Sequence, residues 1–359
     1  MRRKIVFLVT ALLALVKSAQ AQQVTVAPYY GGRVAALSLT FDDGLQEHYT
    51  TVFPELRRRG LKATFAIIGS KVGGKMHSKQ DRADGTDGTL CMTWDQLREI
   101  AADGQEIASH GWEHRAVTRL DEDALHREVE RNDSAIQANL GTKPMTYVYP
   151  GNNKTDETVR YCEQGRVGSR TFQLSLGSKR TAEEMQRYVD ALIDKGDWGV
   201  TMTHGILQGY DHFKDLQVLW AFLDDVCARQ DLLWTAPHRD VAAYVKERDN
   251  TQLIVKQTAD ALTITPKSSL DGKLFQHPLT LIVNVPASTA TQDGRTLECM
   301  QKGDVTLINI NPNGGAIVVK SETLPTRLTA AASSVSQPNG DCRASATRPR
   351  LLISPAIRN

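Results

Sequence analysis

The sequence predicts an α/β protein in which a large domain of βα units around a parallel sheet is followed by a small β-sandwich. Between residues 34 and 241, apolar runs rich in β-forming residues alternate with amphipathic helical stretches, which is the pattern of βα units. After residue 248, short β runs follow one another without helices between them, which indicates an antiparallel sandwich. A chain of 359 residues exceeds one comfortable hydrophobic core, so two domains are expected.

The first 21 residues have the features of a secretory signal peptide. Basic residues at 2–4 precede an uncharged apolar run at 5–16, and residues 19–21 (Ala-Gln-Ala) offer small side chains for cleavage. The apolar run is too short for a membrane-spanning helix, and no later segment approaches the necessary length. The sequence therefore predicts an exported protein, periplasmic or secreted, with no integral membrane segment.

The large domain is expected at residues 22–248. Its strands are predicted at 35–40, 63–68, 106–108, 145–148, 200–202 and 232–235. Helical periodicity is present at 94–103, 121–140, 182–195 and 216–229, and a further helix is expected to end near residue 248. The helix at 121–140 has the clearest end signals, because acidic residues precede it and Gly141 follows it.

A small β-rich domain is expected at residues 249–321. Its β runs lie at 252–257, 261–265, 279–285, 305–310 and 316–320. Residues 322–359 are rich in Ser, Ala, Thr, Arg and Pro without sustained periodicity, so we expect a disordered tail there. The formal net charge of +2 at pH 7 gives no electrostatic case for nucleic acid as a partner. The sequence makes no prediction of oligomeric state.

Two adjacent carboxylates end the first predicted strand of the large domain. Asp42 and Asp43 follow an apolar run and precede Gly44, so we expect them in the site formed at the carboxyl ends of parallel strands. Neighbouring ionised carboxylates repel each other and need a cation or a proton nearby. On this segment alone, an ordinary Asp-Asp-Gly turn is an equally good interpretation.

A histidine pair after the third predicted strand favours a metal. His110 and His114 are four residues apart, so one helical turn would bring both imidazoles to the same side. Two histidines and one carboxylate leave coordination positions open for water and substrate, as in a catalytic metal site. A third histidine, His204, follows the apolar strand at 199–203 and is expected on the same rim.

These segments together resemble the NodB-homology polysaccharide deacetylases, the fourth carbohydrate esterase family, from about residue 35 to residue 241. The run 40–44 (Thr-Phe-Asp-Asp-Gly) is similar to the family's first motif, His110 to His114 to its second, and Thr203-His204 to its last. The resemblance implies a distorted (β/α) barrel with fewer than eight strands. It also implies a divalent metal, with zinc expected, held by Asp43, His110 and His114.

The resemblance further implies hydrolysis of N- or O-linked acetyl groups on an acetylated poly- or oligosaccharide. Asp42 would act as the base that takes a proton from water, and His204 as the acid that protonates the leaving group. The backbone N–H of Gly151 matches the oxyanion-stabilising position. Among the rim aromatics, Tyr149, Trp112 and Trp234 are predicted to bind sugar rings, although packing against the barrel is an equally plausible role for such residues.

The chain also departs from the family pattern. Val148 stands where the third motif carries Arg, and Gly151 stands where it carries Tyr. No copy of the fourth motif, an Asp-bearing segment that works with that Arg, is found, and the corresponding segment has Arg170 instead. Arg170 or Asp197 could supply a substitute charge.

These departures keep two alternatives open: a small amide or imide hydrolase of the same fold, and a carbohydrate-binding protein without turnover. Retention of both Asp42 and His204 argues against the binding protein.

Overall fold

The structure is a computed structural model that describes residues 24–77, 82, 83, 85, 87–258 and 260–320. The predicted signal peptide at 1–21 and the predicted tail at 322–359 lie outside the described residues and remain predictions. All described residues belong to one compact unit. Among them, no helix is both long and apolar enough to span a membrane.

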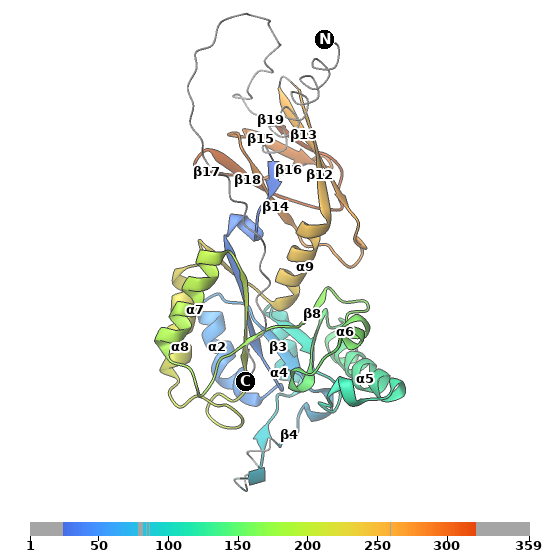
Figure 1. Cartoon of the computed structure of the whole chain (residues 1–359), viewed down its shortest axis with the longest axis vertical. Coiled ribbons are helices and arrows are strands. Elements are labelled where there is room, and N and C mark those ends of the chain that lie inside the picture. The colour runs from blue at the N-terminus through green and yellow to red at the C-terminus, as the bar shows by residue number, and fades with distance from the viewer. Residues whose placement is uncertain (1–23, 78–81, 84, 86, 259, 321–359) are drawn as a thin grey trace, which may run out of the picture. The chain divides into compact units, whose positions relative to one another are not determined.

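A curved parallel sheet forms the centre of the large domain (Figure 1). Its strand order is β8-β7-β6-β3-β2-β10-β9, and β11 also pairs with β2. All of these pairings are parallel. The strands are β2 (Ala35–Phe41), β3 (Thr64–Ile67), β6 (Glu106–Ser109), β7 (Thr146–Val148), β8 (Gly168–Arg170), β9 (Leu174–Ser175), β10 (Trp198–Thr203) and β11 (Leu233–Thr235). The distorted barrel that the resemblance implies is therefore confirmed, although its sheet has eight strands among the described residues, where the resemblance implies fewer.

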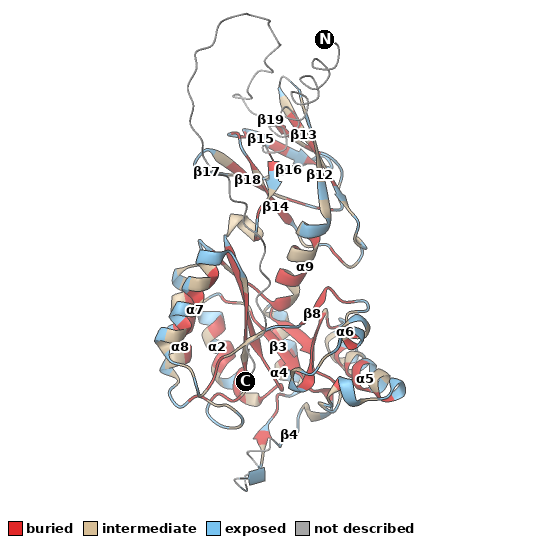
Figure 2. Cartoon of the chain, viewed as in Figure 1, coloured by how far each residue is buried: buried red, intermediate tan, exposed pale blue. Residues whose placement is uncertain are grey.

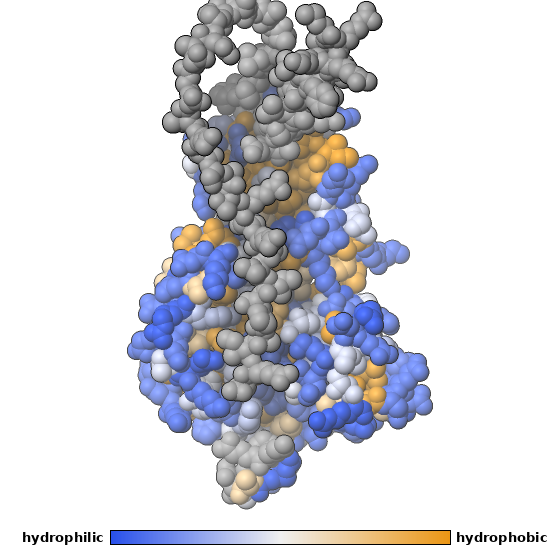
Figure 3. Space-filling model, in the orientation of Figure 1, coloured by the Kyte–Doolittle hydropathy of each residue, from blue (hydrophilic) through white to orange (hydrophobic). Residues whose placement is uncertain are grey.

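Helices pack on the outside of this sheet. They are α2 (Phe53–Arg58), α4 (Trp94–Ala102), α5 (Glu122–Leu140), α6 (Asp156–Cys162), α7 (Ala182–Lys195), α8 (Gln217–Ala228) and α9 (His238–Asn250). Apolar side chains of α2, α4, α7 and α8 share one hydrophobic core with β2 and β3, and Figure 2 shows buried residues along the strands. Hydrophilic residues cover most of the outer surface of the barrel helices on the face that Figure 3 shows, as amphipathic helices require.

The two predicted ends of the helix at 121–140 are confirmed, at Asp121 and at Gly141. The Asp121 side chain accepts a hydrogen bond from the backbone N–H of Ala124 at 2.8 Å, which caps an orphan donor of the first turn. At the other end, Gly141 adopts a left-handed conformation with φ of 78° and ends α5.

The β-rich region is a sandwich of two antiparallel sheets. One sheet has the order β12-β13-β19-β15-β16 and the other β1-β14-β18-β17. Apolar residues of β13 and β19 share a core with those of β14 and β18, so the predicted β-sandwich is confirmed. The strands are β1 (Val24–Val26), β12 (Thr251–Gln257), β13 (Ala261–Ser268), β14 (Leu279–Val283), β15 (Thr289–Gln292), β16 (Arg295–Leu297), β17 (Cys299–Lys302), β18 (Val305–Ile310) and β19 (Ile317–Lys320).

The strand β1 belongs to this sandwich although it precedes the barrel in the chain. Val24 pairs with Val283 of β14 in antiparallel register. The Tyr244 hydroxyl of α9 donates a hydrogen bond to the carbonyl of Ala27 at 2.9 Å, so the segment after β1 is also tied to the last barrel helix. The sequence placed this N-terminal segment in the large domain, because a single short strand carries no signal for its distant partner.

Candidate active site

The predicted site residues follow strands whose carboxyl ends meet at one edge of the parallel sheet. Asp42 and Asp43 follow β2 directly, His110 follows β6, and His204 follows β10. The intervening β3 pairs with both β2 and β6, and β10 pairs with β2 on the other side. The loops at this edge therefore bring together residues that lie up to 162 positions apart (204 − 42) in the chain.

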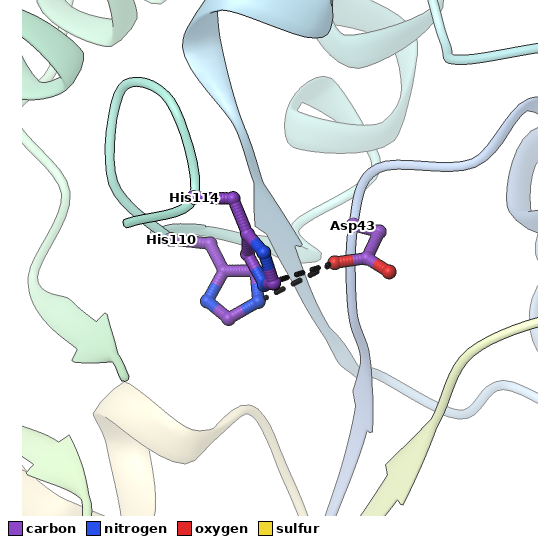
Figure 4. A group of neighbouring side chains, drawn as sticks. All are labelled: Asp43, His110 and His114. Carbon is purple, nitrogen blue, oxygen red and sulfur yellow. Dashed lines mark ion pairs between the residues drawn. The ribbon is translucent and has the colours of Figure 1, made fainter. Parts of the chain in front are cut away.

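Asp43, His110 and His114 form a compact group of three side chains (Figure 4). The Nε2 atoms of His110 and His114 lie 3.5 and 3.6 Å from Oδ1 of Asp43. One ligand atom from each of the three residues lies within 4.8 Å of the other two. Three nitrogen and oxygen ligands thus converge on one point, which is the arrangement of a catalytic metal site with positions left open.

The route by which the two histidines meet differs from the expected helical turn. The structure assigns no helix to residues 110–116. Instead, Gly111 and His114 have φ values of 80° and 63°, so the chain reverses through two left-handed residues. The spacing predicted that the rings meet, but the helical geometry proposed for it is wrong.

These three residues fit a divalent metal. Oδ1 of Asp43 is buried and has no hydrogen-bond partner among the described residues. Nδ1 of His110 lies 2.8 Å from the carbonyl oxygen of Val148 and donates to it, so that in the neutral ring the lone pair lies on Nε2, which faces Asp43. Burial lowers the pKa of His114 to about 4, so its ring is neutral near pH 7. Neutral imidazoles with one carboxylate suit zinc and related divalent metals.

Arg170 holds Asp42 through a buried bidentate ion pair. Its Nη1 and Nη2 atoms lie 2.7 and 2.6 Å from the two carboxylate oxygens of Asp42, and the side chains are 1% and 2% exposed. Burial alone would raise the pKa of Asp42, but the charge and hydrogen bonds of Arg170, together with the nearby His110 and His204, lower it below its usual value. The Asp42 carboxylate is therefore ionised at neutral pH.

The strand register explains how Arg170 substitutes for the missing arginine of the third motif. Val148 on β7 pairs directly with Arg170 on β8. The guanidinium of Arg170, on the strand next to Val148, thus binds the carboxylate of Asp42. Asp197 lies at the opposite end of β10, where its carbonyl accepts a hydrogen bond from Ala36 N–H, so it is not the substitute.

His204 lies beside Asp42 and against an aromatic ring. Its Nε2 is 3.9 Å from Oδ2 of Asp42, and its ring meets Tyr210 edge-on at 5.1 Å between centroids. The His204 side chain is 13% exposed, so one part of the ring is open to the cavity. This position allows a proton to be passed to a group bound between His204 and the metal ligands.

Glu47 and His48, which follow the acidic pair in the chain, bind the segment that carries His204. Oε2 of Glu47 accepts backbone N–H groups from residues 206, 207 and 208 at 3.1, 2.8 and 3.4 Å. Burial lowers the pKa of His48 to about 4, and its neutral ring places Nε2 2.7 Å from the His204 carbonyl. The sequence did not predict a role for Glu47 or His48 at the site, because their partners lie about 160 residues away in the chain.

A cavity of about 670 Å³ opens over these side chains. Its wall includes both acidic residues, the three histidines, and the predicted Tyr149 and Gly151, together with Lys71, Met76, His77, Arg82, Glu113, Asn152, Met202 and Tyr210. Tyr149 is only 1% exposed and donates its hydroxyl proton to Ser169 at 2.9 Å. Tyr210 is 54% exposed, so it offers the larger aromatic surface to a ligand.

Two predicted rim aromatics lie outside the cavity wall. Trp234 packs against Tyr30 and Tyr244 with centroid distances of 5.6 and 5.4 Å, near the amino end of β2, where it pairs with Ala36. Trp112 lies under the Arg131 guanidinium at 4.1 Å. The expectation that Trp234 lies at the site edge is therefore wrong, because apolar packing near the amino end of the strand occupies its ring. Sugar binding by Trp112, whose ring contacts Arg131, stays a prediction.

Comparisons with known proteins point to one family. A family model described as polysaccharide deacetylase matches residues 32–167. A Cryptococcus neoformans var. grubii protein, chitin deacetylase 2, is 26% identical over 175 residues, or 46% of this chain and 34% of that protein. The poly-β-1,6-N-acetyl-D-glucosamine N-deacetylase of Escherichia coli K12 is 40% identical over 79 residues, or 21% of this chain and 12% of that protein. A Rhizobium leguminosarum chitooligosaccharide deacetylase is 31% identical over 99 residues, or 27% and 38%.

The chain thus spans less than two fifths of each of these three relatives. A solved peptidoglycan N-acetylglucosamine deacetylase shares 16% identity, with 59% of this chain and 89% of that chain covered and a TM-score of 0.42, a likeness too weak to support an argument. The family match includes the acidic pair after β2 and both histidines after β6, and it ends before Arg170 and His204. The similarity to the polysaccharide deacetylase family thus covers residues 32–167, less than half of this chain.

Proposed function

We propose that this protein is a metal-dependent hydrolase that removes acetyl groups from an acetylated poly- or oligosaccharide. The observation that carries the proposal is the convergence of a three-ligand group, an arginine-held carboxylate and a third histidine on one cavity. We further propose N-acetylated glycans as the preferred class, because the relatives named above are deacetylases of chitin, chitooligosaccharide and poly-N-acetylglucosamine.

The metal would be held by Asp43, His110 and His114, and we propose zinc. A divalent metal bound there supplies Lewis-acid polarisation of the acetyl carbonyl and lowers the pKa of water. The hydrogen bond from His110 to the Val148 carbonyl fixes the tautomer that ligation needs.

Asp42 and His204 would carry the proton transfers. The ionised Asp42 accepts a proton from water as the water oxygen bonds to the acetyl carbon. His204, in its protonated form, gives a proton to the leaving nitrogen as the carbon–nitrogen bond breaks, so the products are acetate and a free amine. The N–H of Gly151, in the cavity wall, is proposed to donate to the developing oxyanion.

A binding protein without turnover explains the site less well. Such a protein gains nothing from Arg170 and Asp42, whose buried ion pair costs desolvation. No feature of the described residues favours a small amide substrate over a glycan. We also propose export to the periplasm or beyond, on the basis of the basic and apolar start of the sequence.

Acetate release from a substrate panel tests the proposal. The panel comprises chitin oligomers, peptidoglycan and acetylated xylan, each assayed with added zinc and after chelation, with Asp43→Ala as the matched inactive variant. Zinc-dependent release from the N-acetylated members is the expected result. Release from none of the panel by zinc-loaded protein would contradict a glycan deacetylase.

A further inference from the structure

The loop that carries His114 has a backbone that needs external support. His114 has a φ of 63°, a left-handed conformation that is uncommon for a residue with a side chain and costs free energy. Its ring must nevertheless point toward Asp43, at 3.6 Å. Hydrogen bonds from outside the loop are therefore needed to stabilise the backbone on both sides of His114.

The side chain of Glu128 supplies that support from helix α5. Its Oε1 accepts the backbone N–H of Glu113 at 3.0 Å and that of Arg115 at 2.9 Å. Its Oε2 also lies 3.1 Å from the Glu113 nitrogen, and its own carbonyl accepts the N–H of Trp112 at 2.8 Å. Glu128 thus accepts the backbone N–H groups of the two residues on either side of His114.

Glu128 is enclosed by the loop that it holds. The residue is only 3% exposed, so its carboxylate is shielded from solvent, and the two N–H groups would lose their acceptor if the side chain were removed. At Gly111, where φ is 80°, an added Cβ would lie 2.4 Å from Oε1 of Glu128. Only a glycine at position 111 therefore leaves room for the carboxylate of Glu128 in its observed position.

We infer that Glu128 is a positioning residue for the metal centre, which sets the orientation of His114 without touching the metal. The inference rests on the metal-binding part of the proposed function. It assigns a role to a buried glutamate on a helix that carries none of the proposed ligands. Its consequence is that Glu128 contributes to metal affinity through the loop backbone.

Metal affinity measured on the full chain tests this role separately from catalysis. Zinc binding is followed by competition with a chromophoric chelator for wild type, Glu128→Ala, Glu128→Gln and Glu130→Ala. Glu130 is the matched control, because it lies on the same helix and bonds to Tyr161 instead of the loop. Circular dichroism establishes that each variant is folded.

We expect Glu128→Ala to weaken zinc binding by about 10- to 100-fold, as for other outer partners of metal ligands. Glu128→Gln retains one acceptor oxygen, so a smaller loss is expected, and it provides the test if the alanine variant does not fold. Glu130→Ala should bind zinc as the wild type does. Unchanged affinity in folded Glu128 variants would overturn the inference, as would a wild type that binds no zinc. Zinc binding without acetate release would instead contradict only the proposed reaction.

Discussion

Replacing Arg170 by methionine should destabilise the protein through Asp42. Methionine keeps much of the aliphatic volume but leaves a 2% exposed carboxylate without its two hydrogen bonds of 2.6 and 2.7 Å. Breaking a buried ion pair by removing one partner costs about 3–5 kcal/mol. The loss arises from the uncompensated charge, so removing that charge as well should recover part of it.

A double-mutant cycle measures this coupling. The free energy of unfolding is determined by denaturant titration for wild type, Arg170→Met, Asp42→Asn and the double variant. The double variant should lose less than the sum of the single losses by about 2–3 kcal/mol. Arg166→Met is the control, because that buried arginine pairs with Asp133 and should show no coupling to Asp42→Asn. Additive losses at Arg170 and Asp42 would refute the role of the ion pair.

Three other perturbations give separate tests. Asp43→Ala should remove the bound zinc equivalent, because it deletes one of three ligands; metal analysis after dialysis that still finds one equivalent would contradict the assignment. Glu47→Ala removes the acceptor of three backbone N–H groups, so we expect the free energy of unfolding to fall by about 1–3 kcal/mol. We also expect a lower kcat at unchanged zinc affinity. An unchanged kcat would show that Glu47 does not position His204. Burial raises the pKa of Glu247 from 4.5 to about 7, so the folded state binds this proton more tightly than the unfolded state does. The free energy of unfolding therefore includes a stabilising contribution from this proton at low pH, which is lost as the pH rises from 4.5 to 7. Between pH 5 and pH 8 the wild type should therefore lose about 2 kcal/mol more unfolding free energy than Glu247→Gln, and parallel pH curves for the two proteins would contradict this.

The sequence predicted the parts of the site that depend on local pattern. The strand before Asp42 is buried at every residue, and five of its seven residues are apolar, so site residues were expected at its carboxyl end. The strands before His110 and His204 are also largely buried, although each contains polar residues. Because parallel strands end at one edge, three local motifs were sufficient to predict one site.

The supporting residues depend on long-range register and were not predictable in this way. Strand β8 is only three residues long, Gly-Ser-Arg, and has no apolar pattern that would mark it as a strand. The sequence named Arg170 only as one of two guesses for the missing charge. Its pairing with Val148 depends on the position of β7 beside β8 in the barrel, which the local sequence pattern does not determine.

Aromatic residues were the least reliable part of the prediction. Trp234 belongs to a cluster with Tyr30, Tyr244 and His277, which packs between the sandwich and the barrel. A tryptophan at a strand is equally suited to packing and to sugar binding. Tyr210 is 54% exposed and lies beside His204, so it is a better candidate for sugar binding than Trp234.

Acetate release by wild type and Asp42→Asn at matched zinc content tests the central claim most directly. Both proteins are loaded to one zinc equivalent and assayed on chitin oligomers under the same conditions. Since Asp42 is the proposed base and Asp43 the proposed ligand, the variant should keep its zinc and lose at least about 100-fold in kcat. A zinc-loaded Asp42→Asn variant that releases acetate at the wild-type rate would contradict the proposed mechanism.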